Sequence, residues 1–395
     1  MSVFRSEAGR EMIRARYNEI LAQFPLETRY VATPAGRTFV IEAGAKQAPP
    51  VILLHGSCGN GAFLLGDMLA LAPKFRVLSL DIPGEAGNSA DNRLDFHSDA
   101  SVLWLESALD ELNIARAALI GNSFGGWMAL RFASCRPGRV AKLVAAAASG
   151  VVPPSALFQP EALKERMRCA DGRAAISDAI ISDSTLPEPV LAFLRLIGEN
   201  FIPMTEALPV FSDEALQALS MPSLFVFGER DTTLDANAAS VRLHRLLPRA
   251  EVRTLPGQGH VITNIGGTAF PFLSEPMEMH VAEASGELIA LVDRWARIER
   301  TEALLDAMAT AGYLGCTRMA FHAETLGDAF FDLKTGIAGE MLQKFSNYRM
   351  RLAVIGDFSS VTHKSLRDFI WESNNGSTVC FVDSQEQALI RLSAR

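Results

Sequence analysis

The chain has 395 residues, of which 49% are hydrophobic and 21% charged, the composition of a folded protein with a sizeable core rather than of a disordered one. At about 150 residues per domain, this length predicts two or three compact units, and one large and one small domain fit it well. The formal net charge of -8 excludes a basic surface for nucleic acid or an anionic membrane, so we expect a small-molecule partner.

The first twenty residues are rich in Arg and Glu and lack the apolar core of a signal peptide. No segment is long and apolar enough to span a bilayer, so the expected compartment is the cytoplasm. The five cysteines are scattered, without the close pairs of a zinc site or redox motif. They are therefore expected to be reduced and mostly buried.

A helix followed by a series of buried strands is predicted for the first part of the chain. Residues 6–22 carry apolar side chains at helical spacing, and short apolar runs of strand length follow, separated by stretches of helical periodicity. The predicted extended segments are 28–33, 37–43, 50–54, 76–80, 117–120, 142–148, 224–228 and 251–255. Strands that alternate with helices predict an α/β fold, a mostly parallel, doubly wound sheet joined by right-handed crossovers.

This alternation stops between residues 151 and 220, where prolines break the sequence into short helical pieces, and we interpret this stretch as an inserted lid. The alternation restarts after Ile298, so the predicted domains are 1–298 and a small α/β domain over 299–395. The segments expected in the small domain are a helix at 299–312, short segments at 317–322 and 329–333, helices at 335–345, 364–373 and 385–392, and strands at 351–355 and 378–382.

The strongest motif is the stretch from Gly121 to Gly125, which lies between an apolar strand and a helical stretch. The pattern G-x-S-x-G in that context is typical of a nucleophile elbow, in which a strained turn exposes the serine and the small flanking residues avoid the adjacent backbone. The helix that follows directs free N–H groups at a developing oxyanion. Ser123 is therefore the predicted nucleophile, with a glycine-rich packing turn as the alternative.

A serine hydroxyl needs a base near neutral pH, and histidine is the usual candidate. Among seven histidines, His260 follows the strand 251–255 at the carboxyl edge of the sheet, where ligands bind in open α/β folds. His260 is the predicted general base. His55 precedes a glycine at a strand end and is expected to hold its loop, and the other five lie at helices or late in the chain.

The acid should lie between the serine and the histidine in chain order. Asp231 follows the strand 224–228, whereas residues 145–152, at the alternative position, contain no carboxylate. Asp231 is therefore the predicted acid, with Glu229 and Asp235 as alternatives. Asp81 precedes the serine and is expected to stabilise the turn that follows it.

The segment His55-Gly56-Ser57 after the strand 50–54 predicts another wall of the pocket. The N–H groups of Ser57 and Phe124 are the expected oxyanion donors, each worth about 3 kcal/mol of transition-state stabilisation, with a plain glycine turn as the alternative. Cys58 and Asn60 are candidates for lining the acyl pocket, and an apolar lid suggests a partly apolar substrate. The apolar side chains of the lid include Leu157, Phe158, Leu191, Phe193, Leu194, Phe201, Met204 and Phe211, of which Phe158 and Phe201 are predicted to bind substrate.

Residues 1 to about 298 resemble the carboxylesterases of the α/β-hydrolase fold. The resemblance rests on His55-Gly56, the loop 81–89, the elbow at 121–125, residues 228–231 and Gly259-His260. It implies an ester substrate, an acyl-enzyme on the elbow serine, and neither a metal nor an organic cofactor. One departure is residues 265–283, a Gly- and Pro-containing insertion that could reshape the pocket mouth but that we expect to be a surface loop.

The stretches Phe331–Gly336, Phe345–Tyr348 and Ile355–Ser359 carry a second resemblance. Through them, residues from about 317 to 395 resemble an uncharacterised bacterial α/β domain family, which implies a small sheet with helices but no known activity. Its size and position suggest a regulatory role, homodimerisation or binding of a protein partner. Asp332, Asp357 and Lys364 could form a site there, although capping roles are more common for such residues.

Two other functions stay open. The same triad could carry C–C bond hydrolysis, cofactor-free peroxidation or a lyase reaction. Alternatively, the hydrolase fold could be a small-molecule receptor or scaffold whose C-terminal domain delivers the output, although a complete triad argues against a pure binder. The sequence does not select a substrate, because a fold does not determine a function.

Overall fold

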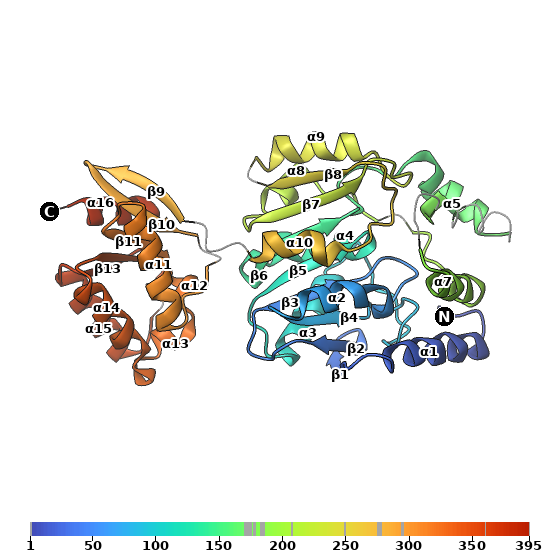
Figure 1. Cartoon of the computed structure of the whole chain (residues 1–395), viewed down its shortest axis with the longest axis horizontal. Helices are drawn as coiled ribbons and strands as arrows, with labels where there is room; N and C mark the ends of the chain where they lie inside the picture. Colours follow the sequence, from blue (N-terminus) through green and yellow to red (C-terminus); the bar gives the residue numbers. More distant parts are fainter. Residues whose placement is uncertain are drawn as a thin grey trace. The chain divides into compact units, whose positions relative to one another are not determined.

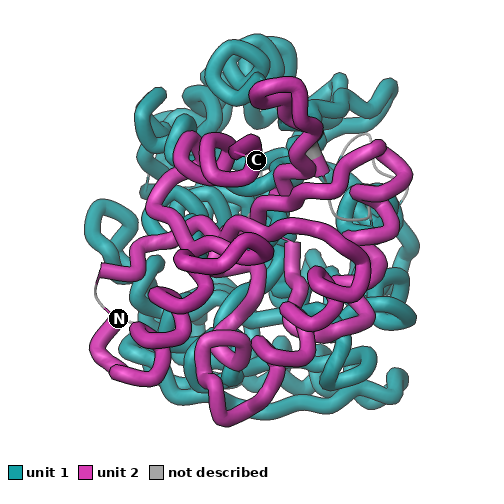
Figure 2. The backbone as a smooth tube through the Cα atoms, turned by 90° about the vertical axis from the view of Figure 1, so that its left-hand side faces the viewer, with its two compact units in different colours: residues 1–274 teal, residues 275–395 magenta. Residues whose placement is uncertain are grey.

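The computed structural model describes residues 2–169, 176, 179–181, 186–206, 208–248, 250–274, 279–293, 296–359 and 361–394. The chain divides into two compact units, residues 1–274 and 275–395 (Figure 2). This division lies ahead of the boundary expected near residue 300, because residues 279–292 form a hairpin that pairs into the sheet of the second unit.

The first unit is built on an eight-stranded sheet with the order β1-β2-β4-β3-β5-β6-β7-β8 (Figure 1). β2 is antiparallel to both β1 and β4, and the remaining neighbours are parallel. The strands are β1 (Glu27–Thr33), β2 (Gly36–Ala43), β3 (Pro50–Leu54), β4 (Arg76–Leu80), β5 (Ala117–Asn122), β6 (Val140–Ala146), β7 (Ser223–Gly228) and β8 (Glu251–Leu255). The predicted α/β fold with a mostly parallel sheet is confirmed.

Both faces of this sheet are buried under helices. In β3, Val51 and Leu53 belong to the core cluster that includes α2 and α10, whereas Ile52 and Leu54 point to the opposite face and are equally buried. α3 packs against α4. The helices of this unit are α1 (Glu7–Leu21), α2 (Leu65–Leu71), α3 (Ala100–Glu111), α4 (Phe124–Cys135), α5 (Pro160–Arg166), α7 (Glu188–Asn200), α8 (Asp213–Gln217), α9 (Ala236–Leu246) and α10 (Ile265–Ser274), with 3-10 turns η1 (Gly61–Leu64), η2 (Pro137–Arg139) and η3 (Ala156–Phe158).

The expectation of a surface loop over residues 265–283 was wrong. Its first part is α10, which buries Ile265 and Ala269 against α2 even though Pro271 lies inside the helix. The carboxylate of Asp67 on α2 accepts a 2.8 Å hydrogen bond from the Gly266 N–H and so caps α10. Burial of an apolar helix face outweighs the glycine and proline signals here. The last part of the stretch is the first strand of the second sheet.

The second unit contains a five-stranded sheet with the order β13-β12-β11-β10-β9, in which only β9 is antiparallel to its neighbour. One core cluster includes α11 and α14, and a smaller one includes α16. The short segment expected at 329–333 spans most of α13 and the start of η4, and the other expected elements are present. The elements are β9 (Met279–Ala284), β10 (Glu287–Val292), α11 (Thr301–Tyr313), β11 (Arg318–His322), α12 (Ala323–Leu326), α13 (Asp328–Phe331), η4 (Leu333–Thr335), α14 (Ile337–Asn347), β12 (Arg351–Ile355), α15 (Lys364–Asn375), β13 (Val379–Val382) and α16 (Gln385–Ser393).

Candidate active site

Ser123 occupies a strained turn between β5 and α4, as the elbow motif predicts. Its φ is +51°, a left-handed value that costs a non-glycine residue of order 1–3 kcal/mol. A Cβ on Gly121 would collide with the carbonyl oxygen of Gly125, and a Cβ on Gly125 would collide with that of Leu54 in β3. The two glycines are therefore required by the close passage of the turn against neighbouring backbone.

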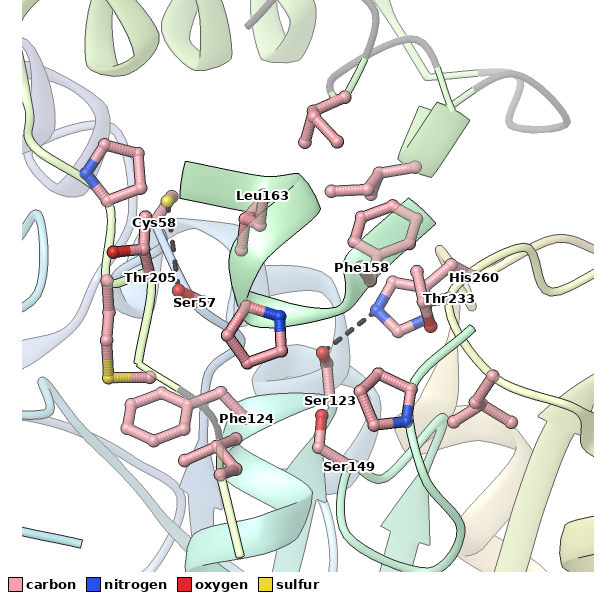
Figure 3. Close-up of a pocket in the computed structure, with 18 of the residues that line it drawn as sticks. Ser57, Cys58, Ser123, Phe124, Ser149, Phe158, Leu163, Thr205, Thr233 and His260 are labelled. Atoms are coloured by element: carbon pink, nitrogen blue, oxygen red, sulfur yellow. Dashed lines mark hydrogen bonds between the residues drawn. The ribbon is translucent and has the colours of Figure 1, made fainter. Parts of the chain in front are cut away.

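The three side chains of the predicted triad lie within hydrogen-bond distance of one another. His260 Nε2 lies 2.9 Å from Ser123 Oγ, and His260 Nδ1 lies 2.8 Å from Asp231 Oδ2 (Figure 3 shows the first of these contacts). Asp231 follows β7 and His260 follows β8, so all three residues stand at the carboxyl edge of the parallel strands. The side chain of Asp231 is fully buried and that of His260 is 10% exposed.

Thr233 joins this group and was missed by the sequence analysis. Its Oγ1 lies 2.7 Å from Asp231 Oδ1 and 2.9 Å from His260 Nδ1, and its N–H donates to the same carboxylate oxygen at 2.8 Å. One proton assignment satisfies all these contacts: the Thr233 hydroxyl donates to Asp231, His260 Nδ1 is protonated, and Nε2 accepts from Ser123. The only signal in the sequence is an aspartate followed by two threonines, which is typical of a turn closed by the aspartate side chain.

Asp231 is held in its ionised form. Burial alone would raise its pKa, but the hydrogen bond and charge of His260, together with the O–H and N–H of Thr233, outweigh burial and keep the pKa below its ordinary value. An ionised carboxylate at this position can orient the imidazole and stabilise it when it becomes protonated.

The alternative acids have structural roles. Glu229 accepts a 2.8 Å hydrogen bond from the Gly257 N–H, which closes the loop after β8. Asp235 accepts from the Ala238 N–H at 2.9 Å and so caps α9. Neither carboxylate is recorded in contact with the histidine, so the geometry favours Asp231.

His55 holds its loop, as expected. Its Nδ1 donates to the Gly56 carbonyl at 2.9 Å, and its Nε2 accepts from the Ile82 N–H at 2.9 Å. Burial lowers its pKa, so the ring stays neutral. Because both ring nitrogens are occupied, His55 has no free nitrogen with which to act as a base.

Asp81 has a wider role than the turn to which the sequence analysis assigned it. The fully buried carboxylate accepts hydrogen bonds from the Tyr17 hydroxyl at 2.9 Å, the Gly61 N–H at 2.9 Å and the Asn88 N–H at 2.8 Å. It therefore joins α1, η1 and the loop after β4 behind the candidate site. Burial raises its pKa despite these donors.

Ser57 and Phe124, the expected oxyanion donors, both line the pocket that contains Ser123 (Figure 3). A Cβ built on Gly56 would lie 3.6 Å from the Cβ of Ser123, so the turn after β3 passes close to this serine. Within the described part of the chain, no protein acceptor is recorded for the N–H of either Ser57 or Phe124. Unpaired N–H groups beside a serine are what an oxyanion site requires.

The pocket above Ser123 has a volume of about 330 Å³ and is walled mainly by apolar side chains of the lid. Cys58 and Phe158 line it, as expected for substrate-binding residues. Phe201 does not, because it is fully buried and packs edge-on against Phe4. Other lid residues in the wall are Leu163, Met167, Ile176, Leu194, Ile197 and Met204.

Asn60, the other candidate for the acyl pocket, is instead fully buried. Its side-chain amide donates to the Ala86 carbonyl at 2.8 Å, and its Oδ1 accepts from the Ala62 N–H at 3.1 Å. Asn60 therefore caps η1 and ties it to the loop after β4.

The lid is anchored to the N-terminal segment by backbone hydrogen bonds. The Arg5 N–H donates to the Asn200 carbonyl at 2.9 Å, and the Ile202 N–H donates to the Val3 carbonyl at 2.8 Å. Helix α1 also packs against α7. The lid helix that contributes to the pocket wall is thus held by residues from the beginning of the sequence.

In the second unit, the carboxylates of Asp332 and Asp357 each accept hydrogen bonds from a residue two positions later in the chain. Asp357 Oδ1 accepts from the N–H and the hydroxyl of Ser359, and Asp332 Oδ1 accepts from the Lys334 N–H at the start of η4. Lys364 begins α15. Both carboxylates therefore have the capping roles that were the alternative to a functional site.

Cys316 and Cys380 are buried, whereas Cys58 and Cys135 are half-buried and Cys169 is exposed, so the expectation of mostly buried thiols was wrong. Among the described residues, no group of three or more His, Cys, Asp or Glu side chains is arranged to hold a metal ion. No helix within the described ranges is long and apolar enough to cross a membrane.

A serine on a strand-to-helix turn, hydrogen-bonded to a histidine and an aspartate at the carboxyl edge of a parallel sheet, defines an α/β-hydrolase class of site. The chain belongs to the alpha/beta hydrolase family, which residues 51–283 match. Residues 284–392 match a domain of unknown function (DUF4180). The second match begins at the last residue of β9, although β9 pairs with β10 in the structure.

The chain is similar to carboxylesterases. Carboxylesterase YbfK of Bacillus subtilis (strain 168) is 28% identical over 277 residues, which cover 65% of this chain and 90% of that protein. The uncharacterized carboxylesterase nap of the same organism is 26% identical over 258 residues, covering 62% and 85%. The crystal structure of carboxylesterase CesB (YbfK) from Bacillus subtilis aligns with a TM-score of 0.62 at 23% identity, over 68% of this chain and 99% of that one. The structural likeness shows the fold.

Proposed function

We propose that the protein is a serine hydrolase that cleaves a carboxylic ester of a small, partly apolar substrate through an acyl-enzyme on Ser123. The observation that carries this proposal is the hydrogen-bonded path from Ser123 through His260 to Asp231, which opens into an apolar pocket. The similarity to carboxylesterases supports the same reaction class.

Each group has a role in this reaction. Ser123 Oγ attacks the ester carbonyl carbon while His260 Nε2 takes its proton, and the resulting oxyanion is received by the N–H groups of Ser57 and Phe124. The intermediate collapses, and the leaving alcohol takes the proton from His260. Water then gives a proton to His260 and attacks the acyl-enzyme carbonyl. When the second intermediate collapses, His260 returns this proton to Ser123 Oγ, which releases the acid and restores the serine. Asp231 stays ionised throughout.

The pocket wall favours a neutral substrate. None of the described residues that line it is Lys or Arg, and its one carboxylate, Glu206, is half exposed and lies 3.4 Å from His97. A negatively charged substrate group would find no cation in this wall and would lose its hydration. An apolar acyl or alcohol group instead gains about 25 cal/mol for each Å² that it buries.

The experiment compares the purified protein with Ser123→Ala, using a fluorophosphonate probe and p-nitrophenyl esters of increasing acyl length. Ser149→Ala is the matched control, because Ser149 lines the pocket beside Ser123 and is not recorded in contact with His260 (Figure 3). Labelling and turnover should vanish in Ser123→Ala and persist in Ser149→Ala. Identification of an acid and an alcohol as products separates ester hydrolysis from C–C cleavage, peroxidation or a lyase reaction.

A folded wild-type protein that is not labelled and turns over no ester contradicts this proposal. Slow or absent turnover together with tight retention of a small ligand would instead support a receptor or scaffold role.

We further propose that the second unit acts in regulation, homodimerisation or binding of a protein partner, because every described residue that lines the pocket belongs to the first unit. Sedimentation of the full chain at increasing concentration tests for a dimer. The proposed compartment is the cytoplasm, which fractionation of expressing cells checks.

A further inference from the structure

The turn formed by residues 56–59, directly after β3, has an uncommon backbone conformation. Cys58 has a φ of +58°, in the left-handed region that costs a non-glycine residue of order 1 kcal/mol or more. A positive φ at the third residue of a four-residue turn means that the central peptide, between Ser57 and Cys58, is rotated relative to the commonest turn type. This rotation decides where the Cys58 N–H and the Ser57 carbonyl point.

A carboxylate from another loop holds this peptide. Glu85 Oε2 accepts a hydrogen bond of 2.6 Å from the Cys58 N–H. Glu85 lies in the loop after β4 and is only 5% exposed. Hydrogen bonds to an ionised acceptor are shorter and roughly twice as strong as those between neutral groups. The bond from Glu85 therefore offsets the backbone strain at Cys58 and opposes rotation of the central peptide.

We propose that Glu85 is a positioning residue: its carboxylate holds the Ser57–Cys58 peptide of the turn 56–59 and so keeps Ser57, whose own N–H belongs to the preceding peptide, in the place where it can donate to the oxyanion that forms beside Ser123. This inference rests on the proposed ester hydrolysis. Figure 3 shows Ser57 and Cys58 together in the pocket wall, with Ser123 in the same pocket. Glu85 itself does not line the pocket, so it acts through the backbone of the turn.

Among the described residues, the charged or titratable groups that face Glu85 are Arg93 and the Cys58 thiol. Burial raises the pKa of Glu85 to about 7, against the opposing effects of the Cys58 N–H and the Arg93 charge. Burial, with the charge of Glu85, raises the pKa of the Cys58 thiol to about 12, so that thiol stays protonated.

Protonation of Glu85 weakens the hold on the turn. The neutral acid loses the charge that strengthens its bond to the Cys58 N–H. It also gains an O–H that can donate to the Ser57 carbonyl if the central peptide rotates. The observed conformation of the turn 56–59 is therefore favoured where Glu85 is ionised, which is above neutral pH.

The test compares Glu85→Leu, Glu85→Gln and the matched control Asp67→Asn in the full chain. Asp67 is also a buried carboxylate that accepts a backbone N–H, but it lies against α10 and does not line the pocket. Glu85→Leu should lower kcat for a p-nitrophenyl ester by about 10- to 100-fold, with KM changed by less than about twofold, because an oxyanion donor is displaced. Glu85→Gln keeps an acceptor oxygen but, like the protonated acid, has no charge, so above neutral pH its kcat should lie between those of Glu85→Leu and the wild type, and Asp67→Asn should match the wild type.

The pH dependence of kcat/KM provides a second measurement, which a general loss of stability does not change. The ratio of the wild-type kcat/KM to that of Glu85→Gln reports the titration of Glu85, because every other titratable group is common to the two proteins. This ratio should exceed one above neutral pH and fall towards one as the pH drops through about 7, where Glu85 gains its proton. This measurement needs only the conservative variant, so it is informative even if Glu85→Leu does not fold.

Three results overturn the inference. A Glu85→Leu protein that folds and keeps the wild-type kcat shows that the turn needs no carboxylate. Equal losses in Glu85→Leu, Glu85→Gln and Asp67→Asn show a general stability effect. A ratio of wild-type to Glu85→Gln kcat/KM that does not change with pH shows that the charge of Glu85 does not affect activity. Absence of any wild-type turnover or probe labelling is a different outcome, because it removes the proposed ester hydrolysis itself.

Discussion

Replacing Asp67 by asparagine should change how the stability of the first unit depends on pH. Asp67 is 7% exposed and accepts the Gly266 N–H at the start of α10. Burial raises its pKa from 3.8 to about 6, more than its hydrogen bonds to α10 lower it. The folded protein therefore binds this proton more tightly than the unfolded chain does. Its contribution to stability is fully present below pH 3.8 and is lost as the pH rises through 6.

The size of the effect follows from the pKa difference. A shift from 3.8 to about 6 is roughly two pKa units, and at 1.36 kcal/mol per unit the ionisation of Asp67 lowers the free energy of unfolding by about 3 kcal/mol. Asparagine does not titrate, and its Oδ1 can still accept the Gly266 N–H. The unfolding free energy of the variant minus that of the wild type should rise by about 2–3 kcal/mol between pH 4 and pH 7.

The assay is denaturant unfolding of both proteins at matched pH, followed by tryptophan fluorescence, since Trp104 and Trp127 are buried in the first unit. Other carboxylates titrate in both proteins and cancel in the difference. If the difference in unfolding free energy stays constant or falls between pH 4 and pH 7, the reasoning is refuted, because burial would then not destabilise the ionised form of Asp67.

Three further predictions follow from the site. Asp231→Asn should lower kcat about 10³- to 10⁴-fold, because the amide no longer selects the histidine tautomer that accepts from serine; ester turnover checks this, with Glu229→Gln expected to stay within about tenfold of wild type. Gly125→Ala should prevent folding or lower the melting temperature, whereas Gly138→Ala, where a Cβ meets nothing within 4 Å, should leave circular dichroism melting unchanged. Glu206→Arg should raise kcat/KM for a monoanionic ester relative to its neutral analogue by about three- to tenfold at low salt, and an unchanged ratio would contradict a pocket that disfavours anions.

The sheet, and the meeting of Ser123, Asp231 and His260 at its edge, were largely predictable because buried parallel strands form short apolar runs. The expected segments 50–54, 76–80 and 251–255 have the observed bounds of β3, β4 and β8. The carboxyl ends of parallel strands share one edge, so residues that follow them can be grouped without a structure. Asp231 and His260 were identified in this way.

What the sequence did not show depends on contacts between distant segments. The strand 279–284 was assigned to the first domain, because only its pairing with β10 reveals the sheet to which it belongs. Phe158 and Phe201 are the same residue type in the same lid, and packing alone places one in the pocket and the other in the core. The bond from Glu85 to Cys58 joins residues 27 apart and leaves no periodic pattern.

The anchoring of the lid to the N-terminal segment bears on how hydrolases of this kind can be recombined. A chimera that exchanges only the lid, about residues 151–220, would separate α7 from its partners on α1. It would also leave the Val3 carbonyl without its donor and the Arg5 N–H without its acceptor. A transplant that carries the N-terminal helix together with the lid preserves both contacts. In this protein the smallest exchangeable specificity module is therefore discontinuous in sequence.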